Sequence, residues 1–493
     1  MRQPNRLVRC IALLTLGACI AGTSLQPASA QALTKKLTDR YAFLPVDPKR
    51  TDWSEGEKFA IALSAIEEES GGRLEFKRGA CVAEFSVIYH RATWPAVVAA
   101  AQTHGYKHGL DIRGSVQSPA SAQRWCGDNP DLCNQRARLF VDLPAPPPNR
   151  ADLEPIKVAV IDTGIDKERL GSFFIGNPRT FLTGHPTNPT PPDGRAGAID
   201  DNGHGTHMAS NIVTLAGADN DVVRIIPIKS YDADGHGLFF DQAQAVDYAA
   251  RTTDGGQGAD IVNASWGAYP GGSGPQSVAV EALWRCMAKY PNTLFVTAAG
   301  NYNNLNQKRF FYPASFSVAS STVLQRLEHV LSVMGVSWHP GEGRDDDVCP
   351  LWVGSNYGPN SVDVAAPMTL VQGLYPRNLL RAPDKFGLSC RLSGTSVSAA
   401  ILSGVMARLF YDHQARARPR DWPQQLRGTL ANFEVPLKIL KPGEPERFID
   451  NRAKGHLRRP HSPDPTLCHP LNATKAPPLS AHADETCRFL RKP

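Results

Sequence analysis

The chain has 493 residues, of which 42% are apolar and 20% are charged, and its net charge is +6 at neutral pH. These values exclude a disordered or fibrous chain, and they leave room for a full-sized hydrophobic core plus a smaller domain. The mild charge excess gives no support for nucleic acid as a partner, because nucleic-acid-binding domains concentrate more cations on one face.

The first 30 residues have the pattern of a bacterial export signal. Three arginines within the first nine residues precede an apolar stretch from 10 to 21, and Ala28-Ser-Ala30 follows. This arrangement predicts a secreted or periplasmic protein that is cleaved after Ala30. A competing interpretation uses Leu16-Gly-Ala-Cys19, in which Cys19 would become a lipid-bearing N-terminus. No later apolar stretch reaches the length of a membrane span.

Residues 31–150 predict a small α+β domain followed by a linker. Apolar patterning indicates helices at 55–68 and 94–103, and strands near 73–77, 82–89 and 110–115. The Pro-rich segment 143–148 should be stiff and exposed.

The next strong signal is the apolar run 158–161, which predicts a buried parallel strand with Asp162 at its C-terminal end. Open α/β sheets place their sites at this edge. Gly203 and Gly205 flank His204, and small and apolar residues recur at helical spacing from 206 to 215. His204 should therefore lie at a helix N-terminus, close to the strand end.

A second helical run begins at Gly394-Thr-Ser396. Unpaired N–H groups at a helix N-terminus favour developing negative charge, so the backbone N–H of Ser396 is a candidate oxyanion donor. Asn301 follows the apolar strand 293–296 and offers a side-chain amide for the same purpose. Ser398 lies about 200° around the helix, so its hydroxyl cannot point the same way as that of Ser396.

Asp162, His204 and Ser396 occur in this order along the chain. A serine hydroxyl needs a positioned base to become a nucleophile, and the base needs an oriented partner that holds its tautomer. The order Asp, His, Ser is the one known from subtilisin, and it excludes the orders His, Asp, Ser and Ser, Asp, His.

Several segments resemble the subtilisin family. The matching motifs are Val-Ile-Asp162-Thr-Gly, His204-Gly-Thr-His, Ala-Ala-Gly-Asn301 and Gly-Thr-Ser396. Ser265-Trp266-Gly267 is similar to the family segment that pairs with the substrate backbone and forms one wall of the specificity pocket, and the segment 363–367 also fits. The resemblance covers roughly residues 151–415.

The resemblance implies a three-layer α/β/α domain with a mainly parallel sheet, preceded by a small α+β propeptide that assists folding and blocks the site until it is removed. It also implies a serine endopeptidase that acts through an acyl-enzyme, with Asp162, His204 and Ser396 as the triad and Asn301 in the oxyanion hole. The substrate-binding residues it implies are Ser265, Trp266, Gly267 and Gly300. We expect protein or peptide substrates and a monomer.

No cofactor or metal is expected. The loop 216–223 is shorter than the strong calcium loop of the family and lacks its Asn-rich pattern. The acidic run Asp345–Asp347 is of a kind that more often forms a solvated turn than a cation site.

The helix after Ser396 departs from the family pattern. Val397 follows the serine directly, where the family usually has methionine, and Ala400 replaces the expected proline. Without the thioether, activity should resist mild peroxide better than is usual in the family.

Two other functions stay open. One is a peptidase fold without turnover that serves for binding or as a scaffold, and the other is a general esterase. A binding module would not need Asp162, His204, Asn301 and Ser396 together, which favours the peptidase. The sequence does not predict the substrate preference, because loops such as 302–312 depart from the family in length.

Eight of the ten cysteines follow the export signal, an even number that is consistent with disulfides. We predict that Cys126 pairs with Cys133 and that Cys468 pairs with Cys487. If every thiol pairs, Cys81 must bond to the catalytic core, where the remaining cysteines are Cys286, Cys349 and Cys390. The N-terminal region would then stay tethered after cleavage or be a permanent domain.

The predicted organisation is an export signal (1–30), a propeptide-like domain with its linker (31–150), a catalytic domain (151–415) and an irregular C-terminal extension (416–493). The extension is rich in Pro, Arg and His and shows no periodic pattern.

Overall fold

The structure is a computed structural model that describes most of the chain between residues 40 and 414. The described residues are 40–50, 52–71, 74–81, 83–89, 93–116, 153–173, 178–182, 198–217, 222–253, 255–270, 277–306, 308–318, 324–336, 349–350, 354–358, 361–368, 371–376, 379, 389–414, 437–439 and 447–448. The predicted signal, the Pro-rich linker and the cysteines at 126, 133, 468 and 487 lie outside them. None of the helices in these ranges combines the length and apolar character that a membrane crossing requires.

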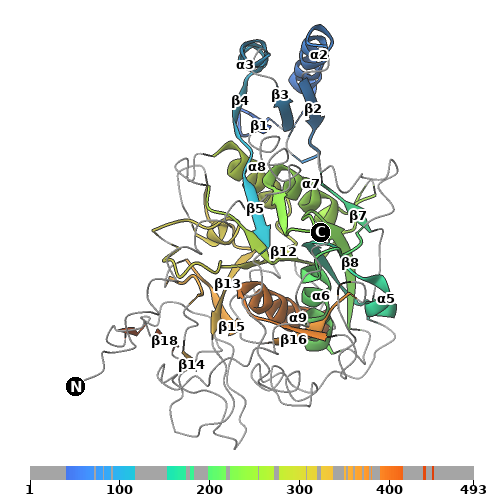
Figure 1. The fold of residues 1–493 in the computed structure, drawn as a ribbon, viewed down its shortest axis with the longest axis vertical. Helices are drawn as coiled ribbons and strands as arrows, with labels where there is room; N and C mark the ends of the chain where they lie inside the picture. The colour runs from blue at the N-terminus through green and yellow to red at the C-terminus, as the bar shows by residue number, and fades with distance from the viewer. Residues whose placement is uncertain are drawn as a thin grey trace, which may run out of the picture.

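Residues 40–110 form a small α+β unit, drawn in blue at the top of Figure 1. Its sheet is antiparallel with the order β2-β3-β1-β4. The strands are β1 (Arg40–Pro45), β2 (Leu74–Arg78), β3 (Phe85–Tyr89) and β4 (Tyr106–Leu110), and the helices are α2 (Ser54–Glu69) and α3 (Trp94–Thr103). Phe43, Phe59, Phe85 and Tyr106 form the centre of a core separate from that of the larger domain.

Both predicted helices of this unit are confirmed, and two of its predicted strands correspond to β2 and β3. The strand predicted near 110–115 corresponds to β5 (Arg113–Val116) and to only the last residue of β4, so most of β4 was not predicted. The first strand, β1, was not predicted.

The larger domain is built on a seven-stranded sheet with the order β15-β13-β12-β10-β6-β8-β7. Every neighbouring pair in it is parallel, which confirms the predicted mainly parallel sheet. Its strands are β6 (Ile156–Asp162), β7 (Arg179–Thr180), β8 (Val223–Lys229), β10 (Ile261–Ala264), β12 (Leu294–Ala298), β13 (Val330–Val336) and β15 (Val364–Pro367).

Helices cover both faces of this sheet and make three layers (Figure 1). Side chains alternate between the faces of a strand, so Val158 and Val160 join one core cluster while Ala159 and Ile161 join the other. The first cluster contains residues of α6 (His204–Ala216) and α9 (Thr395–Gln414), and the second contains residues of α7 (Phe239–Ala250) and α8 (Val278–Ala288).

The strand order reverses beside β6. The chain continues from β6 to β7 and β8 on one side, whereas β10 and the later strands extend the sheet on the other side. Ligands of open α/β sheets bind at the carboxyl ends of strands next to such a reversal. Asp162 ends β6 at this point, and Ser265 directly follows β10.

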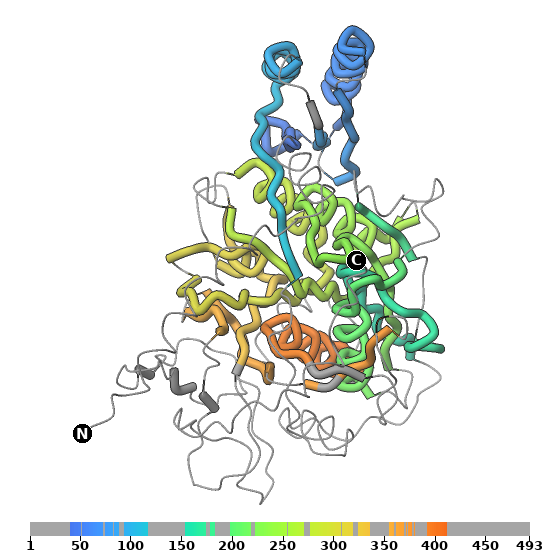
Figure 2. The backbone as a smooth tube through the Cα atoms, viewed as in Figure 1, coloured from blue at the N-terminus to red at the C-terminus, as the bar shows by residue number. Residues whose placement is uncertain are grey.

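The small unit sits over α7 and α8, and the strand that follows it, β5, enters the larger domain. Figure 2 shows this segment as the cyan trace that descends into the body of the molecule. There β5 lies between β11 (Trp266–Gly267) and β9 (His236–Leu238), antiparallel to both. We call this position between β9 and β11 the strand slot.

Two short strands belong to the predicted C-terminal extension. Strand β18 (Leu437–Ile439) pairs with β19 (Arg447–Phe448) and with β14 (Cys349–Pro350) of the larger domain.

Candidate active site

The structure brings Asp162 and His204 into contact at the carboxyl end of β6. Nδ1 of His204 lies 2.8 and 3.0 Å from the two carboxylate oxygens of Asp162, and both side chains are buried. An ionised carboxylate only accepts hydrogen bonds, so Nδ1 carries the hydrogen and Nε2 of the neutral ring carries a lone pair. Nε2 is buried and has no hydrogen-bond partner among the described residues.

Close backbone packing sets the position of His204. A Cβ atom on Gly205 would overlap the carbonyl oxygen of Gly164, so glycine lets the start of α6 approach the chain just beyond β6. Gly203 has φ +99°, and the Tyr375 ring occupies the space that its side chain would need. A side chain at either of the two positions that flank His204 would therefore displace neighbouring atoms, which explains why both are glycine.

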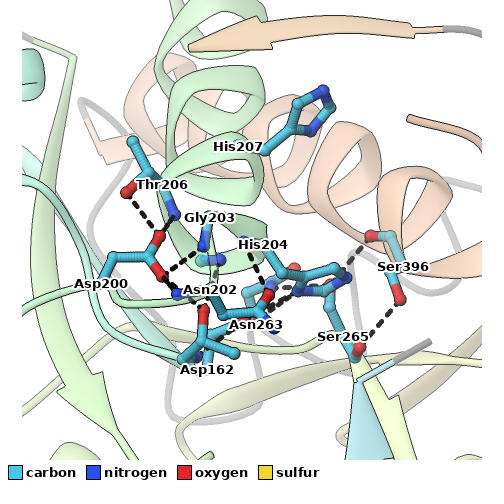
Figure 3. Close-up of polar contacts among 12 residues, drawn as sticks. Asp162, Asp200, Asn202, Gly203, His204, Thr206, His207, Asn263, Ser265 and Ser396 are labelled. Atoms are coloured by element: carbon cyan, nitrogen blue, oxygen red, sulfur yellow. Dashed lines mark hydrogen bonds and ion pairs between the residues drawn. The ribbon is translucent and has the colours of Figure 1, made fainter. Parts of the chain in front are cut away.

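Asp200 fixes the first turn of α6. Its Oδ1 accepts hydrogen bonds from the backbone N–H groups of Asn202 and Gly203 and from Oγ1 of Thr163. Its Oδ2 accepts from the backbone N–H and Oγ1 of Thr206 (Figure 3). One buried carboxylate thus joins the residue after Asp162 to both sides of His204.

This role of Asp200 was not predicted from the sequence. The sequence signal for a helix start is a capping side chain at the residue directly before the helix, which here is Gly203, and Asp200 lies three residues earlier. No local pattern therefore indicated that its carboxylate meets the first N–H groups of α6.

A buried lysine lies on the neighbouring strand. Lys229 ends β8 opposite Asp162, and its Nζ donates to the carbonyl oxygen of Thr163 and to Oδ1 of Asp201, each at 2.6 Å. Burial raises the pKa of the Asp201 carboxyl, and the charge of Lys229 offsets part of this effect. Lys229 and Asp200 together hold the chain on either side of Asp162 and His204.

Ser396 is the second residue of α9, so its backbone N–H lies among the unpaired donors of a helix N-terminus. Its hydroxyl donates to the carbonyl oxygen of Ser265 at 2.8 Å. The Ser265 hydroxyl in turn donates to the carbonyl oxygen of Ser396 and accepts from Nδ2 of Asn263. The structure therefore joins Ser396 to Ser265, and no hydrogen bond links its hydroxyl to His204.

Asn301 lies beside the start of α9. Its Oδ1 accepts from the backbone N–H and from Oγ1 of Thr395, both at 2.9 Å. Because the oxygen is held by Thr395, Nδ2 is the end of the amide that faces Gly394, at 3.0 Å from the Cβ position of that glycine. Gly300 donates its N–H to the same Thr395 hydroxyl.

Three aromatic side chains line the strand slot. Tyr231 and Phe239 lie against Trp266, with ring centroids 5.8 and 6.2 Å from the indole. Gly114 of β5 faces this group, and the Tyr231 hydroxyl beside it is buried with no hydrogen-bond partner among the described residues. Burial and the charge of Asp162 raise the pKa of Tyr231 well above its usual value, so this hydroxyl is neutral.

Two nearby residues have other partners. His207 points away from His204 in Figure 3, and its Nε2 donates to the carbonyl oxygen of Val371 at 3.0 Å. The hydroxyl of Ser398 is bonded to the carbonyl oxygens of Ala366 and Pro367, in a different direction from that of Ser396.

No group of three or more His, Cys, Asp or Glu side chains within the described ranges could hold a metal ion. The acidic run at 345–347 lies outside these ranges.

Comparison with known proteins places the chain in a family. A profile of the Subtilase family, peptidase S8, matches residues 154–450, which is more than half of the chain. The chain therefore belongs to the Subtilase family. The matched region continues past residue 415, where the sequence analysis placed the end of the catalytic domain.

Its curated relatives are distant. Subtilisin DY of Bacillus licheniformis is 25% identical over 261 residues, which cover 51% of this chain and 75% of that protein. Subtilisin BL of Lederbergia lenta is 27% identical over 258 residues, with the same coverage of 51% and 75%. A thermostable alkaline protease of Halalkalibacterium halodurans is 27% identical over 257 residues, which cover 51% of this chain and 55% of that protein.

A crystal structure of a cold adapted subtilisin-like serine proteinase also aligns with this protein. The TM-score is 0.43 at 21% identity, and the alignment covers 66% of this chain and 98% of that chain.

Proposed function

We propose that this protein is an exported serine endopeptidase. Ser396 attacks the carbonyl carbon of the scissile bond, and His204 Nε2 takes the hydroxyl proton and later gives it to the leaving amine. Asp162 keeps the His204 hydrogen on Nδ1 and stabilises the imidazolium that forms. Water then hydrolyses the acyl-enzyme by the same route.

The backbone N–H of Ser396 and Nδ2 of Asn301 are the proposed donors to the oxyanion. The hold of Thr395 on the Asn301 oxygen supports this assignment, because it leaves the amide nitrogen free of that contact. Ser265, Trp266, Gly267 and Gly300 are the proposed substrate-binding residues. In the structure β11 (Trp266–Gly267) pairs with the extended strand β5, which supports a role for β11 in binding an extended substrate chain.

The observation that carries the proposal is the buried contact between Asp162 and His204 Nδ1, which leaves Nε2 without a partner. Unpaired buried nitrogens are costly in a folded core and are found where a site needs them. A scaffold without turnover would have no use for this arrangement.

We further propose that residues 1–30 direct export and that the N-terminal domain is an inhibitory propeptide. Strand β5 fills the slot in which a substrate strand would pair, which supports inhibition. Because Ser265 directly precedes β11 and contacts Ser396, we expect self-cleavage within a few residues after Val116. The enzyme would act on protein or peptide substrates as a monomer, and acylation of Cys19 is the alternative to cleavage after Ala30.

The test is labelling by a fluorophosphonate probe together with casein hydrolysis, after the N-terminal domain has been removed. Ser396→Ala should abolish both signals. Ser398→Ala is the matched control, because this hydroxyl lies on the same helix and bonds elsewhere; it should keep both. An inert protein with the native sequence would favour the scaffold, and ester turnover without casein cleavage would favour an esterase.

A further inference from the structure

We propose that the N-terminal domain stays attached after the chain is cut and acts as a tethered inhibitor that only reduction can release. This inference rests on the proposed peptidase function. It goes beyond that function because a propeptide held by the chain alone would leave once the chain is cleaved.

A disulfide crosses the boundary between the two domains. Cys81 follows β2 of the small unit and bonds to Cys286 in α8, with a Cα–Cα distance of 5.5 Å. Three partners for Cys81 were compatible with the sequence, and the structure selects Cys286. Any cut between Val116 and the start of β6 leaves these two cysteines on different fragments, which the disulfide continues to join.

Buried charges seal the same boundary. Arg40 in β1 is 1% exposed, and its guanidinium contacts Asp111 at 3.3 Å and Asp241 of α7 at 3.1 Å. It also lies over the Phe240 ring. Separation of the domains would break the buried ion pair between Arg40 and Asp241.

Further hydrogen bonds, two of them with a charged partner, surround the disulfide. Gln244 of α7 accepts from the backbone N–H of Ala80 at 2.6 Å and donates to Glu84 at 2.7 Å. Lys289, next to α8, donates to the carbonyl oxygen of Cys81. Both sulfur-bearing residues are buried, Cys81 at 7% exposure and Cys286 at 0%. A reductant therefore reaches the bond slowly while the domain is docked.

The tether changes how inhibition responds to dilution. A covalently linked module acts at an effective concentration of roughly millimolar, whereas a free module is as dilute as the sample. In an assay at about 1 nM protein, the linked inhibitor has an advantage of about 10⁶-fold in concentration. The cut, oxidised protein should therefore remain inhibited at any dilution.

Release proceeds by reduction of the disulfide, for which a dithiol is the reductant used here. A thiolate of the reductant attacks one sulfur of the Cys81–Cys286 bond and forms a mixed disulfide, which its second thiol resolves. Two electrons and two protons pass to the protein, which gains two thiols, and the reductant leaves as a disulfide. The N-terminal domain is then held by non-covalent contacts alone.

The test uses the full chain with a specific protease site placed in the linker segment 143–148, so that a cut is assured. The native protein is compared with the Cys81→Ala/Cys286→Ala double variant, both cut and kept free of reductant. Non-reducing and reducing gels report covalent linkage, and gel filtration reports whether the fragments co-elute. Casein hydrolysis is measured from micromolar to nanomolar protein.

On gels, we expect the two fragments of the cut native protein to run as one species without reductant and as two species with dithiothreitol. Its specific activity should stay unchanged on dilution, and that of the double variant should rise at least about tenfold. If the variant misfolds, native protein treated with dithiothreitol should show the same rise. An N-terminal fragment that leaves the native protein without reductant would overturn the tether. A linked complex whose separated catalytic fragment is inert would instead overturn the peptidase.

Discussion

Ser396 and Ser265 are joined by two reciprocal hydrogen bonds, each 2.8 Å long. The hydroxyl of Ser396 donates to the carbonyl oxygen of Ser265, and the hydroxyl of Ser265 donates to that of Ser396. This pairing directs the proposed nucleophile away from His204 Nε2 in a chain whose strand slot is filled by β5. The proposed mechanism requires the Ser396 hydroxyl to exchange this carbonyl for Nε2 of His204 as its acceptor.

Replacement of Asp200 should lower activity through the position of His204. Asp200→Ala removes an acceptor for five hydrogen bonds around the start of α6. Displacement of a reacting group by about 1 Å can cost roughly 10²-fold in rate. We expect kcat to fall by about that factor with KM changed less than about threefold, and the free energy of unfolding to fall by roughly 2–4 kcal/mol.

Two further variants separate positioning from general stability. Asp200→Asn keeps the Oδ1 acceptor and should recover part of the lost kcat. Asp166→Ala is the matched control, since this nearby carboxylate accepts from Glu168 at the start of a short helix outside the site. A drop in thermal stability with an unchanged kcat in the Asp200→Ala protein would contradict the positioning role.

The sequence predicted those parts of the site that depend on local signals. The apolar run before Asp162 defines β6, and the glycines around His204 and Ser396 define two helix starts. Each is a pattern within ten or so neighbouring residues, to which strand and helix periodicity respond directly.

The parts that were missed depend on contacts between distant residues. Strand β5 pairs with 236–238 and 266–267, and no local pattern in the three segments predicts these pairings. The hydrogen bond from Ser396 to Ser265 likewise exists only because β10 and α9 meet in the fold. Cysteine counting directed Cys81 to the core, but the choice of Cys286 required the packing of the small unit on α8.

Valine instead of methionine at position 397 should make the activity of the enzyme resistant to oxidation. Val397 follows Ser396 and is 1% exposed, packed in the core beneath the site. Mild peroxide has no thioether to oxidise at this position. The activated native enzyme should keep most of its activity under conditions that inactivate Val397→Met, with casein hydrolysis as the readout. Equal rates of inactivation in the two proteins would refute this expectation.

A side chain on Gly114 should expel β5 from the strand slot. A Cβ atom there would lie 3.1 Å from the Tyr231 hydroxyl oxygen and 3.2 Å from Cε1 of Phe239, before any further atoms are added. Gly114→Val should therefore raise the casein hydrolysis of the uncut protein at least about tenfold and speed hydrogen exchange in β5. Slow exchange in the variant, equal to that of the native strand, would show that the slot accepts a larger residue.

A second substitution should restore the binding of β5 in the Gly114→Val protein. Phe239→Ala removes the ring that a valine would strike, so the Gly114→Val/Phe239→Ala double variant should recover protection of β5. Ser115→Ala is the control on the neighbouring position, where backbone pairing with Gly267 is retained.

The buried cluster at the domain boundary should make stability depend on pH. Burial raises the pKa of Asp111 to about 6, with the charge of Arg40 opposing this effect and that of Asp241 adding to it. Lys77, whose ammonium contacts Asp241, also faces these groups, and the charges of Glu75 and Arg179 act on Arg40 and Lys77. A carboxyl whose pKa is raised in the native state stabilises that state fully below its unfolded pKa near 4, and this contribution is lost as pH rises through 6.

Urea unfolding from pH 4 to 7 measures this effect. The free energy of unfolding of the native protein should fall by up to about 3 kcal/mol relative to that of Asp111→Asn. This variant keeps an oxygen acceptor for the N–H groups of Ile112 and Phe240 but does not titrate. Parallel pH profiles for the two proteins would mean that Asp111 titrates normally and that the cluster does not govern the docking of the domain.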